Sequence, residues 1–263
     1  MLKLESVCKT FAKGQPTENQ LFHDLNLEIH KGDFISVIGS NGSGKTTLLN
    51  IIAGTLKPER GAILFDGENV TEKAEHKRAA KIARVFQDPK LGTCSSMTVA
   101  ENMTLAMNKG KKYGLKWGIK KSYIADFADQ LKVLNMGLED KLHVLCGQLS
   151  GGQRQALALL MSTMTKPDLL LLDEHTAALD PRTSETIMEL TKKVIQERNI
   201  TALMITHNLE YAIRYGSRLM MLHDGQILLD MKDQQKRELT ITRLVELFKN
   251  VQGGVLTDEM LFQ

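Results

Sequence analysis

The chain has 263 residues, a formal net charge of +3, 42% hydrophobic residues and 25% charged residues, which is typical of a globular protein with a sizeable core. The small net charge is no argument for nucleic-acid binding, and the longest apolar runs are far shorter than the roughly 20 residues that span a bilayer. The three cysteines, Cys8, Cys94 and Cys146, lack C-x-x-C spacing, so we expect reduced thiols in a cytoplasmic protein.

The first third of the chain predicts strands around one helix. Apolar and polar residues alternate over 2–8 and 21–30, which favours two antiparallel strands with one solvated face. A more continuously apolar strand at 33–38 leads into a glycine-rich loop and a helix from 45 to about 53. Further short strands are predicted at 61–67, closed by an Asp-Gly turn, and at 82–86.

The glycine-rich loop fits the G-x-x-x-x-G-K-[ST] pattern of a nucleotide-binding P-loop. Its glycines allow backbone N–H groups to turn around the β-phosphate, and the following helix directs its positive end there. Lys45 would neutralise the β and γ oxygens, and the Thr46 hydroxyl would bind Mg²⁺. A flexible Gly/Ser loop is the less favoured alternative. The predicted nucleotide-binding residues of this segment are Gly39, Ser40, Asn41, Gly42, Ser43, Gly44, Lys45, Thr46 and Thr47.

From about 97 to 165 the pattern is helical, with no convincing strand. Thr98 is predicted to cap the first helix in a capping box with Glu101, and further helices are predicted over about 119–134 and 151–164. The segment 109–121 contains six lysines and the only tryptophan. A solvated loop is the favoured interpretation, and contact with anionic lipid or with the edge of a permease is the alternative.

A second phosphate-related motif opens the last of these helices. The residues Leu149-Ser150-Gly151-Gly152-Gln153 place a serine and a glycine pair at a helix start, which is an anion-binding design. One nucleotide has a single γ-phosphate, so a second such turn needs its own explanation. The one we favour is that it binds the nucleotide held by a second copy of the protein.

Acidic and polar residues follow the predicted strands of the core. Asp173, at the end of the strand 168–173, is placed to hold Mg²⁺ through water, and Glu174 to orient or deprotonate an attacking water. An acidic pair also often merely flanks a strand. Gln87 could face the metal and His207 the γ-phosphate, although either residue alone is more often solvated or structural. Strands at 201–206 and 218–222 alternate with helices at about 182–198 and 208–215, which argues for a parallel sheet.

The order of these motifs resembles the ATP-binding cassette (ABC) ATPase family over essentially the whole chain to about residue 230. The resemblance implies an α/β fold: a P-loop NTPase core with a parallel sheet, an antiparallel β subdomain and an inserted α-helical subdomain. The expected ATP-binding domain is 1–240, with the helical subdomain at about 97–165, and 241–263 form a C-terminal helix and tail.

The resemblance also implies residue roles in a head-to-tail dimer that holds two ATP molecules. Each ATP would lie between one subunit's P-loop and the other's Ser150-Gly151-Gly152 turn, followed by Gln153. Gln87 would sense Mg²⁺ and the membrane partner, and Glu174 would be the general base. His207 would contact the γ-phosphate, Asp180 would link the two sites, and Phe11 would stack on adenine. The catalytic set is therefore Lys45, Gln87, Glu174 and His207, and the metal set is Thr46, Gln87 and Asp173.

Two positions depart from the family pattern. His175 stands where proline is common, and Ala177 stands where serine is common. Losing proline frees one backbone φ angle and adds an imidazole close to Glu174. We expect hydrolysis to be retained and hypothesise that His175 modulates Glu174 and alters the pH profile.

The function implied is the ATP-hydrolysing subunit of a transporter at the cytoplasmic face of the membrane, bound to separate permease subunits. By analogy we favour import, with an extracytoplasmic solute-binding protein as a further partner and no nucleic acid. The residues 173–180 look like those of cassettes paired with aromatic amino-acid importers. The alternative is a soluble cassette ATPase of DNA repair or translation, but the chain lacks the long coiled-coil insertion or second cassette usual there. A GTPase is disfavoured because no N-K-x-D motif is present.

Overall fold

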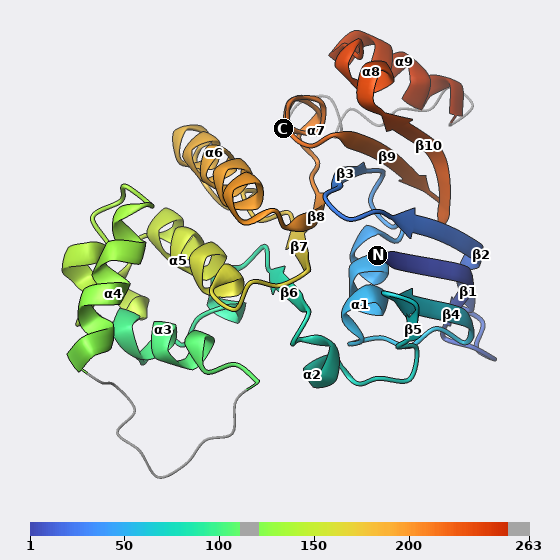
Figure 1. Cartoon of the computed structure of the whole chain (residues 1–263). Coiled ribbons are helices and arrows are strands. Elements are labelled where there is room, and N and C mark those ends of the chain that lie inside the picture. The colour runs from blue at the N-terminus through green and yellow to red at the C-terminus, as the bar shows by residue number, and fades with distance from the viewer. Residues whose placement is uncertain (111–120, 252–263) are drawn as a thin grey trace. The chain divides into compact units, whose positions relative to one another are not determined.

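The computed structural model describes residues 1–110 and 121–251, which fall into two units (Figure 1). The first unit comprises Met1–Arg78 and Thr201–Gln263, and the second comprises Ala79–Ile200. Of the sequence-based predictions, most of the lysine-rich run 109–121 and the tail after 251 lie outside the described residues. None of the helices described is long and apolar enough to cross a membrane.

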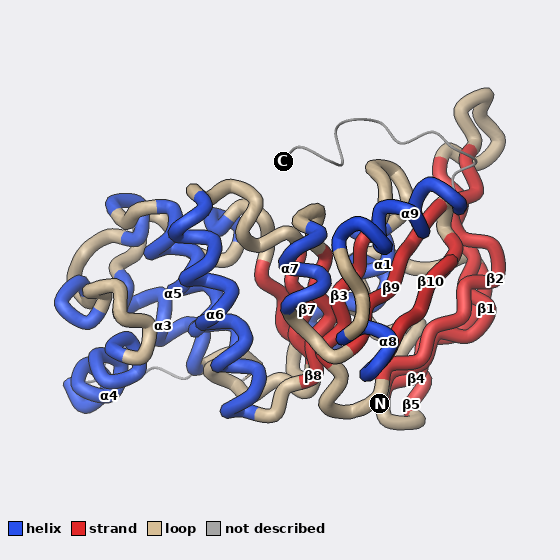
Figure 2. Tube along the Cα trace, turned by 90° about the horizontal axis from the view of Figure 1, so that it is seen from above, coloured by secondary structure: helices blue, strands red, loops and turns tan. Residues whose placement is uncertain are grey.

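The first unit begins with an antiparallel sheet in the order β2-β1-β4-β5 (Figure 2). In this sheet Leu4 lies opposite Leu27 on one side and Ile63 on the other, and all three side chains are buried. The predicted turn at Asp66-Gly67 is present, with positive φ angles of 50° and 79°, as a two-residue hairpin turn requires. The strands are β1 (Leu2–Phe11), β2 (Asn19–Ile29), β4 (Arg60–Phe65) and β5 (Glu68–Asn69).

The same unit contains parallel strands in which β3 lies between β8 and β9, with β10 antiparallel at the edge. Because β3 is buried along its whole length, its sequence is apolar at every position except Ser36 rather than alternating. The strands are β3 (Phe34–Ile38), β8 (Thr201–Ile205), β9 (Arg218–His223) and β10 (Gln226–Lys232). The helices are α1 (Lys45–Ala53), α2 (Glu75–Arg78), α7 (Leu209–Arg214), α8 (Asp233–Arg237) and α9 (Ile241–Val251).

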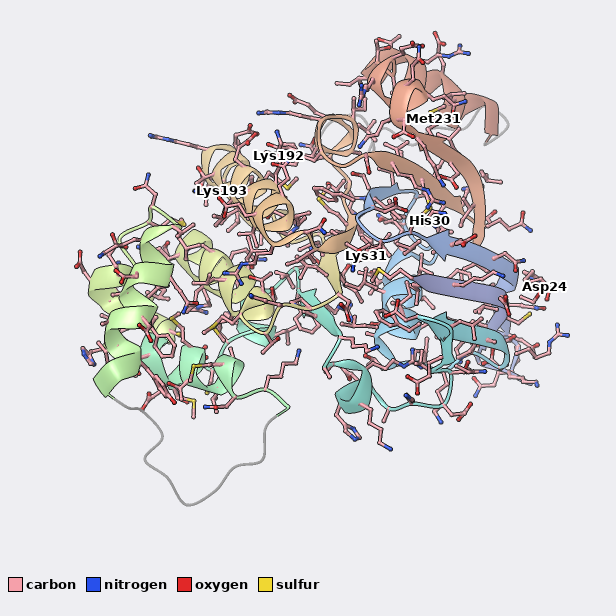
Figure 3. The ribbon with its side chains drawn as sticks, in the orientation of Figure 1. Asp24, His30, Lys31, Lys192, Lys193 and Met231 are labelled. Carbon is pink, nitrogen blue, oxygen red and sulfur yellow. The ribbon has the colours of Figure 1, made fainter. Side chains whose placement is uncertain are left out.

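The second unit contains the predicted helical segment together with the parallel pair β6 (Ile82–Val85) and β7 (Leu169–Asp173). Its helices are α3 (Val99–Met107), α4 (Lys121–Lys132), α5 (Gly151–Thr163) and α6 (Pro181–Arg198). Short 3₁₀ turns cover Pro89–Leu91, Glu139–Lys141 and Cys146–Gln148. Charged side chains are exposed on α6, where Lys193 lies 3.9 Å from Glu197 and next to Lys192 (Figure 3).

The predicted α/β fold is confirmed, including the parallel strands, the antiparallel sheet and the helical segment. The capping box of α3 is also present, because Thr98 Oγ1 accepts from the Glu101 N–H and the Glu101 carboxylate accepts from the Thr98 N–H. The strand β10 and the helices α2 and α8 were not predicted. In β10, half-buried and exposed residues alternate, which gives a weaker signal than the fully buried strands do.

Candidate nucleotide-binding site

The loop between β3 and α1 leaves the start of α1 open. Gly44 occupies the cap position with a φ of 101° and has no side chain with which to cap the helix, and the first turn holds no acidic residue. The first N–H groups of an α-helix have no partner within the helix and carry partial positive charge. This loop and helix start are therefore chemically suited to a phosphate group.

Glycine is required at two of these positions because other atoms come very close. A Cβ atom on Gly39 would lie 2.1 Å from the Leu222 carbonyl oxygen, and one on Gly44 would lie 2.8 Å from the Phe22 ring. Within the described part of the chain, the buried Ser43 Oγ has no hydrogen-bond partner. A buried hydroxyl of this kind has capacity for an oxygen-rich ligand, so the loop fits a nucleotide phosphate.

The Lys45 side chain lies over the same loop. It is 6% exposed, and its Nζ donates to the carbonyl oxygens of Gly39 and Ser40, both at 2.9 Å. Thr46 is exposed and Thr47 is half-buried. The ammonium group is thus held beside the helix start by neutral acceptors, which a charged phosphate oxygen can replace.

Phe11 and His207, two other predicted site residues in the first unit, are both exposed. Phe11 ends β1 and is 39% exposed, with Lys9 Nζ 5.6 Å from its ring centroid. Lys9 is held by Glu59 at 2.6 Å. An exposed aromatic ring at a strand end can stack on a flat base. His207 lies two residues after β8.

In the second unit, Asp173 is the last residue of β7, and its side chain is nearly buried. Asp173 is 8% exposed, and its Oδ2 accepts from Arg84 of β6 at 2.5 Å. Glu174 follows with a φ of 46°, a conformation that residues other than glycine rarely adopt. Backbone strain of this kind tends to persist at functional positions. Sequence reasoning missed Arg84, because 89 positions separate it from its partner.

His175 contacts α6 and is 2% exposed. Its Nε2 lies 3.1 Å from Thr191 Oγ1, and that hydroxyl donates to the Ile187 carbonyl oxygen at 2.7 Å. Because the hydroxyl proton is already used, Nε2 must be the donor to Thr191. Burial lowers the pKa of His175 to about 4, so the ring is neutral at pH 7 and should not itself titrate in that range.

The predicted second phosphate motif lies at the start of α5, and its own side chains cap the first turn of that helix. Ser150 Oγ accepts from the Gln153 N–H at 3.2 Å, and the Gln153 side chain accepts from the Ser150 N–H at 3.3 Å. Gly152 is needed for packing, since a Cβ there would lie 2.3 Å from Thr183 Cγ2. Asp180 caps α6 through the Thr183 N–H, and this bonding lowers the pKa of its carboxyl group.

A hydrogen-bonded segment leads to this motif. The Cys146 N–H donates to the Met97 carbonyl oxygen at 2.9 Å, and the Val99 N–H donates to Val144 at 3.0 Å. The buried Asn102 side chain adds bonds to Cys94, Met97 and Cys146. The chain just before Ser150 is therefore tied to the start of α3.

Gln87 is exposed and follows β6 by two residues. Beside it, Asp88 caps the turn Pro89–Leu91 through the Lys90 N–H. A pocket of about 200 Å³ opens in this unit. Its lining is mostly small and apolar and includes two cations; among the lining residues are Arg84, Phe86, Pro89, Ala106, Lys109 and Met161.

Residues 22–177 match the family model described as ABC transporter. The chain belongs to the ABC transporter family of ATPases. It is 48% identical over 249 residues to a tyrosine transport ATP-binding protein of Clostridioides difficile, covering 95% of this chain and 99% of that protein. The family match and this relative show that the chain is an ABC-type ATP hydrolase that binds ATP.

Solved ABC cassettes have the same fold. A dimeric post-hydrolysis state of the cassette MJ0796 bound to ADP and Pi has a TM-score of 0.74 and 33% identity, with 88% of this chain and 98% of that chain covered. Another is cbiO1 of Clostridium perfringens, described as part of an ABC transporter complex. It has a TM-score of 0.75 and 26% identity, with 95% of this chain and 94% of that chain covered.

Proposed function

We propose that this ABC ATPase is the ATP-hydrolysing subunit of a membrane transporter and works as a head-to-tail dimer. The observation that carries the proposal is that one chain has two glycine-bearing helix starts of the anion-binding type, at α1 and α5, and a single P-loop. A single nucleotide needs only one of these helix starts for its terminal phosphates. The Ser150 turn is then available to the nucleotide of a second copy.

The residues of the first unit bind the nucleotide in this proposal. Phe11 stacks on adenine, the loop N–H groups and Lys45 hold the β and γ phosphates, and His207 contacts the γ-phosphate. The open start of α1 and the unpartnered Ser43 hydroxyl support this assignment.

Most of the remaining groups belong to the second unit. Hydroxyl, amide and carboxylate oxygens are suitable ligands for Mg²⁺, and we assign this role to Thr46, Gln87 and Asp173. The cation would neutralise charge on the phosphates. Glu174 orients the attacking water and accepts its proton, while Asp180 links the two sites of the dimer.

Mixing two inactive variants tests the dimer. Lys45→Ala damages the P-loop and Ser150→Arg damages the second turn. In a head-to-tail heterodimer one site carries both changes and the other carries neither. Equal mixing should restore roughly a quarter of wild-type hydrolysis, because about half of the dimers then have one intact site of two. Activity that stays at the level of the separate variants would contradict a site shared between chains.

We further propose that the transporter imports an aromatic amino acid through separate permease subunits, with an extracytoplasmic solute-binding protein delivering it. The near full-length similarity to a tyrosine transport ATP-binding protein supports this cargo, and the protein would then lie at the cytoplasmic face of the membrane. The pocket beside Pro89 would receive a cytoplasmic segment of the permease.

Co-purification and uptake test this part of the proposal. The tagged protein should be recovered with a multi-span membrane protein, and its deletion should abolish tyrosine, tryptophan or phenylalanine uptake. Ala106→Glu, which places a charge in the pocket, should reduce recovery of the permease and leave ATP binding intact. Recovery with DNA or ribosomes instead would favour the soluble alternative.

A further inference from the structure

Arg84 and Asp173 are brought together by the register of β6 and β7. Arg84 lies opposite Leu171 in this parallel pair, and Asp173 is two residues further along β7. Side chains two residues apart on a strand project from the same face, so the guanidinium and the carboxylate share one face of the sheet. The contact of 2.5 Å between Arg84 Nη2 and Asp173 Oδ2 follows from this placement.

The pair is shielded from water. Both side chains are only 12% exposed, and the Arg84 guanidinium also lies 4.8 Å from the centroid of the Phe86 ring. A carboxylate buried to this extent is costly without a positive partner. Arg84 therefore supplies the positive partner of Asp173 and fixes the position of its carboxylate.

We propose that Arg84 also weakens the hold of Asp173 on Mg²⁺, because it already neutralises the carboxylate that the metal must share. The inference rests on the proposed role of Asp173 in binding Mg²⁺. Because Mg²⁺ can bind Asp173 only by sharing or breaking the charge-assisted hydrogen bond to Arg84, its affinity is lowered by about tenfold or more. Arg84 is in this sense a positioning residue that sets how readily the metal enters and leaves.

Nucleotide binding measures this effect without hydrolysis. The affinity of the full-length protein for the non-hydrolysable analogue AMP-PNP is measured by calorimetry with and without saturating Mg²⁺. The affinity with Mg²⁺ divided by the affinity without it is called the metal factor. Arg84→Gln, which removes the charge and keeps a donor, should raise this factor about tenfold. Arg84→Lys, which keeps the charge, should leave it within about threefold of wild type. Arg243→Gln is the control, since it breaks an exposed pair with Glu246 at 3.0 Å.

A double-mutant cycle separates the local effect from a general change in charge. In the Asp173→Asn background, Arg84→Gln should no longer raise the metal factor. An unchanged factor in Arg84→Gln alone, or an equal rise in the Asp173→Asn background, would overturn the proposal. If Arg84→Gln does not fold, a tenfold lower metal factor in Arg84→Lys would also overturn the proposal. The orientation of the Asp173 carboxylate, and not the charge at position 84, would then determine metal binding.

The proposed function fails separately. If wild-type binding of AMP-PNP showed no metal factor, or if Asp173→Asn left it unchanged, Asp173 would not bind the metal at all. A metal factor that depends on Asp173 but not on Arg84 leaves the function standing and removes only this inference.

Discussion

The helices α1 and α5 both begin at glycine-rich turns, and they differ in whether side chains accept hydrogen bonds from their first N–H groups. At α1 the cap residue is Gly44, which has no side chain to bond to the helix start. At α5 the side chains of Ser150 and Gln153 bond to each other's N–H groups. The first helix start is thus open to phosphate, whereas at the second Ser150 must share or exchange a bond that it already makes. We infer that α1 provides most of the affinity for ATP and that the Ser150 turn adds catalysis.

Removing the charge beside α1 should have the largest effect. Lys45→Ala should lower both binding of ATP and its hydrolysis by a factor of about 100 or more, because a charge-assisted bond to the phosphates is lost. Calorimetry and a steady-state phosphate-release assay measure the two. Lys57→Ala, which removes a lysine of an exposed ion pair with Glu72, is the matched control. Comparable losses in both variants would mean that overall charge and not the loop binds the nucleotide.

At α5, two substitutions of Ser150 separate helix capping from catalysis. Aspartate is as good a cap as serine, but its charge repels a phosphate. Ser150→Asp should therefore keep the melting temperature and lower hydrolysis at least about tenfold, with ATP binding to the monomer unchanged. Ser150→Ala should cost about 1 kcal/mol of stability.

The capping box of α3 provides the control for this pair. Thr98→Ala should lower the stability by a similar amount, since Thr98 and Glu101 make the same bonds as Ser150 and Gln153. It should leave the chemistry of the nucleotide untouched. Wild-type hydrolysis in Ser150→Asp would show that the serine only caps α5, and the contrast between the two helices would lose its functional meaning.

The two helix starts also show what the sequence can and cannot predict. The loop at 39–46 was predictable because its motif is contiguous and its glycines are required by the local backbone geometry. The capping box of Thr98 and Glu101 was predicted from residues three apart, and that of Ser150 and Gln153, which was not predicted, has the same spacing. The partner of Asp173 was not predictable, because Arg84 reaches it only through the pairing of two strands that lie far apart in the chain. The packing of Gly152 on Thr183 and the burial of His175 against Thr191 are also tertiary contacts, so they were not predictable from the sequence either.

The stability of the second unit should depend on pH through His175. Its pKa is about 4 in the folded protein and ordinarily 6.5, so between these values the unfolded chain binds more protons. The free energy of unfolding should therefore be fully retained above pH 6.5 and fall by about 3 kcal/mol as the pH drops towards 4. Urea unfolding at pH 7.5, 6 and 5 measures this.

His175→Gln tests the assignment, because an amide can still donate to Thr191 and cannot titrate. This contribution to the pH dependence should disappear in the variant, while the pH–rate profile of hydrolysis between pH 7 and 8.5 should match wild type. A shifted profile in that range would revive a direct action of His175 on Glu174.

The last comparison concerns the glycine pair that opens α5, where Gly151→Ala should have the smallest effect of all the substitutions. Gly152→Ala places a Cβ 2.3 Å from Thr183 Cγ2, and such overpacking costs about 1–3 kcal/mol. The added Cβ of Gly151→Ala meets only Leu179 at 3.5 Å, an ordinary contact, so the stability of this variant should stay within about 0.5 kcal/mol of wild type.

A substitution of Thr183 tests the cause of the loss in Gly152→Ala. Thr183→Ser removes the methyl group that the new Cβ would meet and keeps the N–H that bonds to Asp180. Combined with Gly152→Ala it should recover most of the loss in a thermal melt. Without such a recovery, the loss of stability in Gly152→Ala would not come from the contact with the Thr183 methyl group.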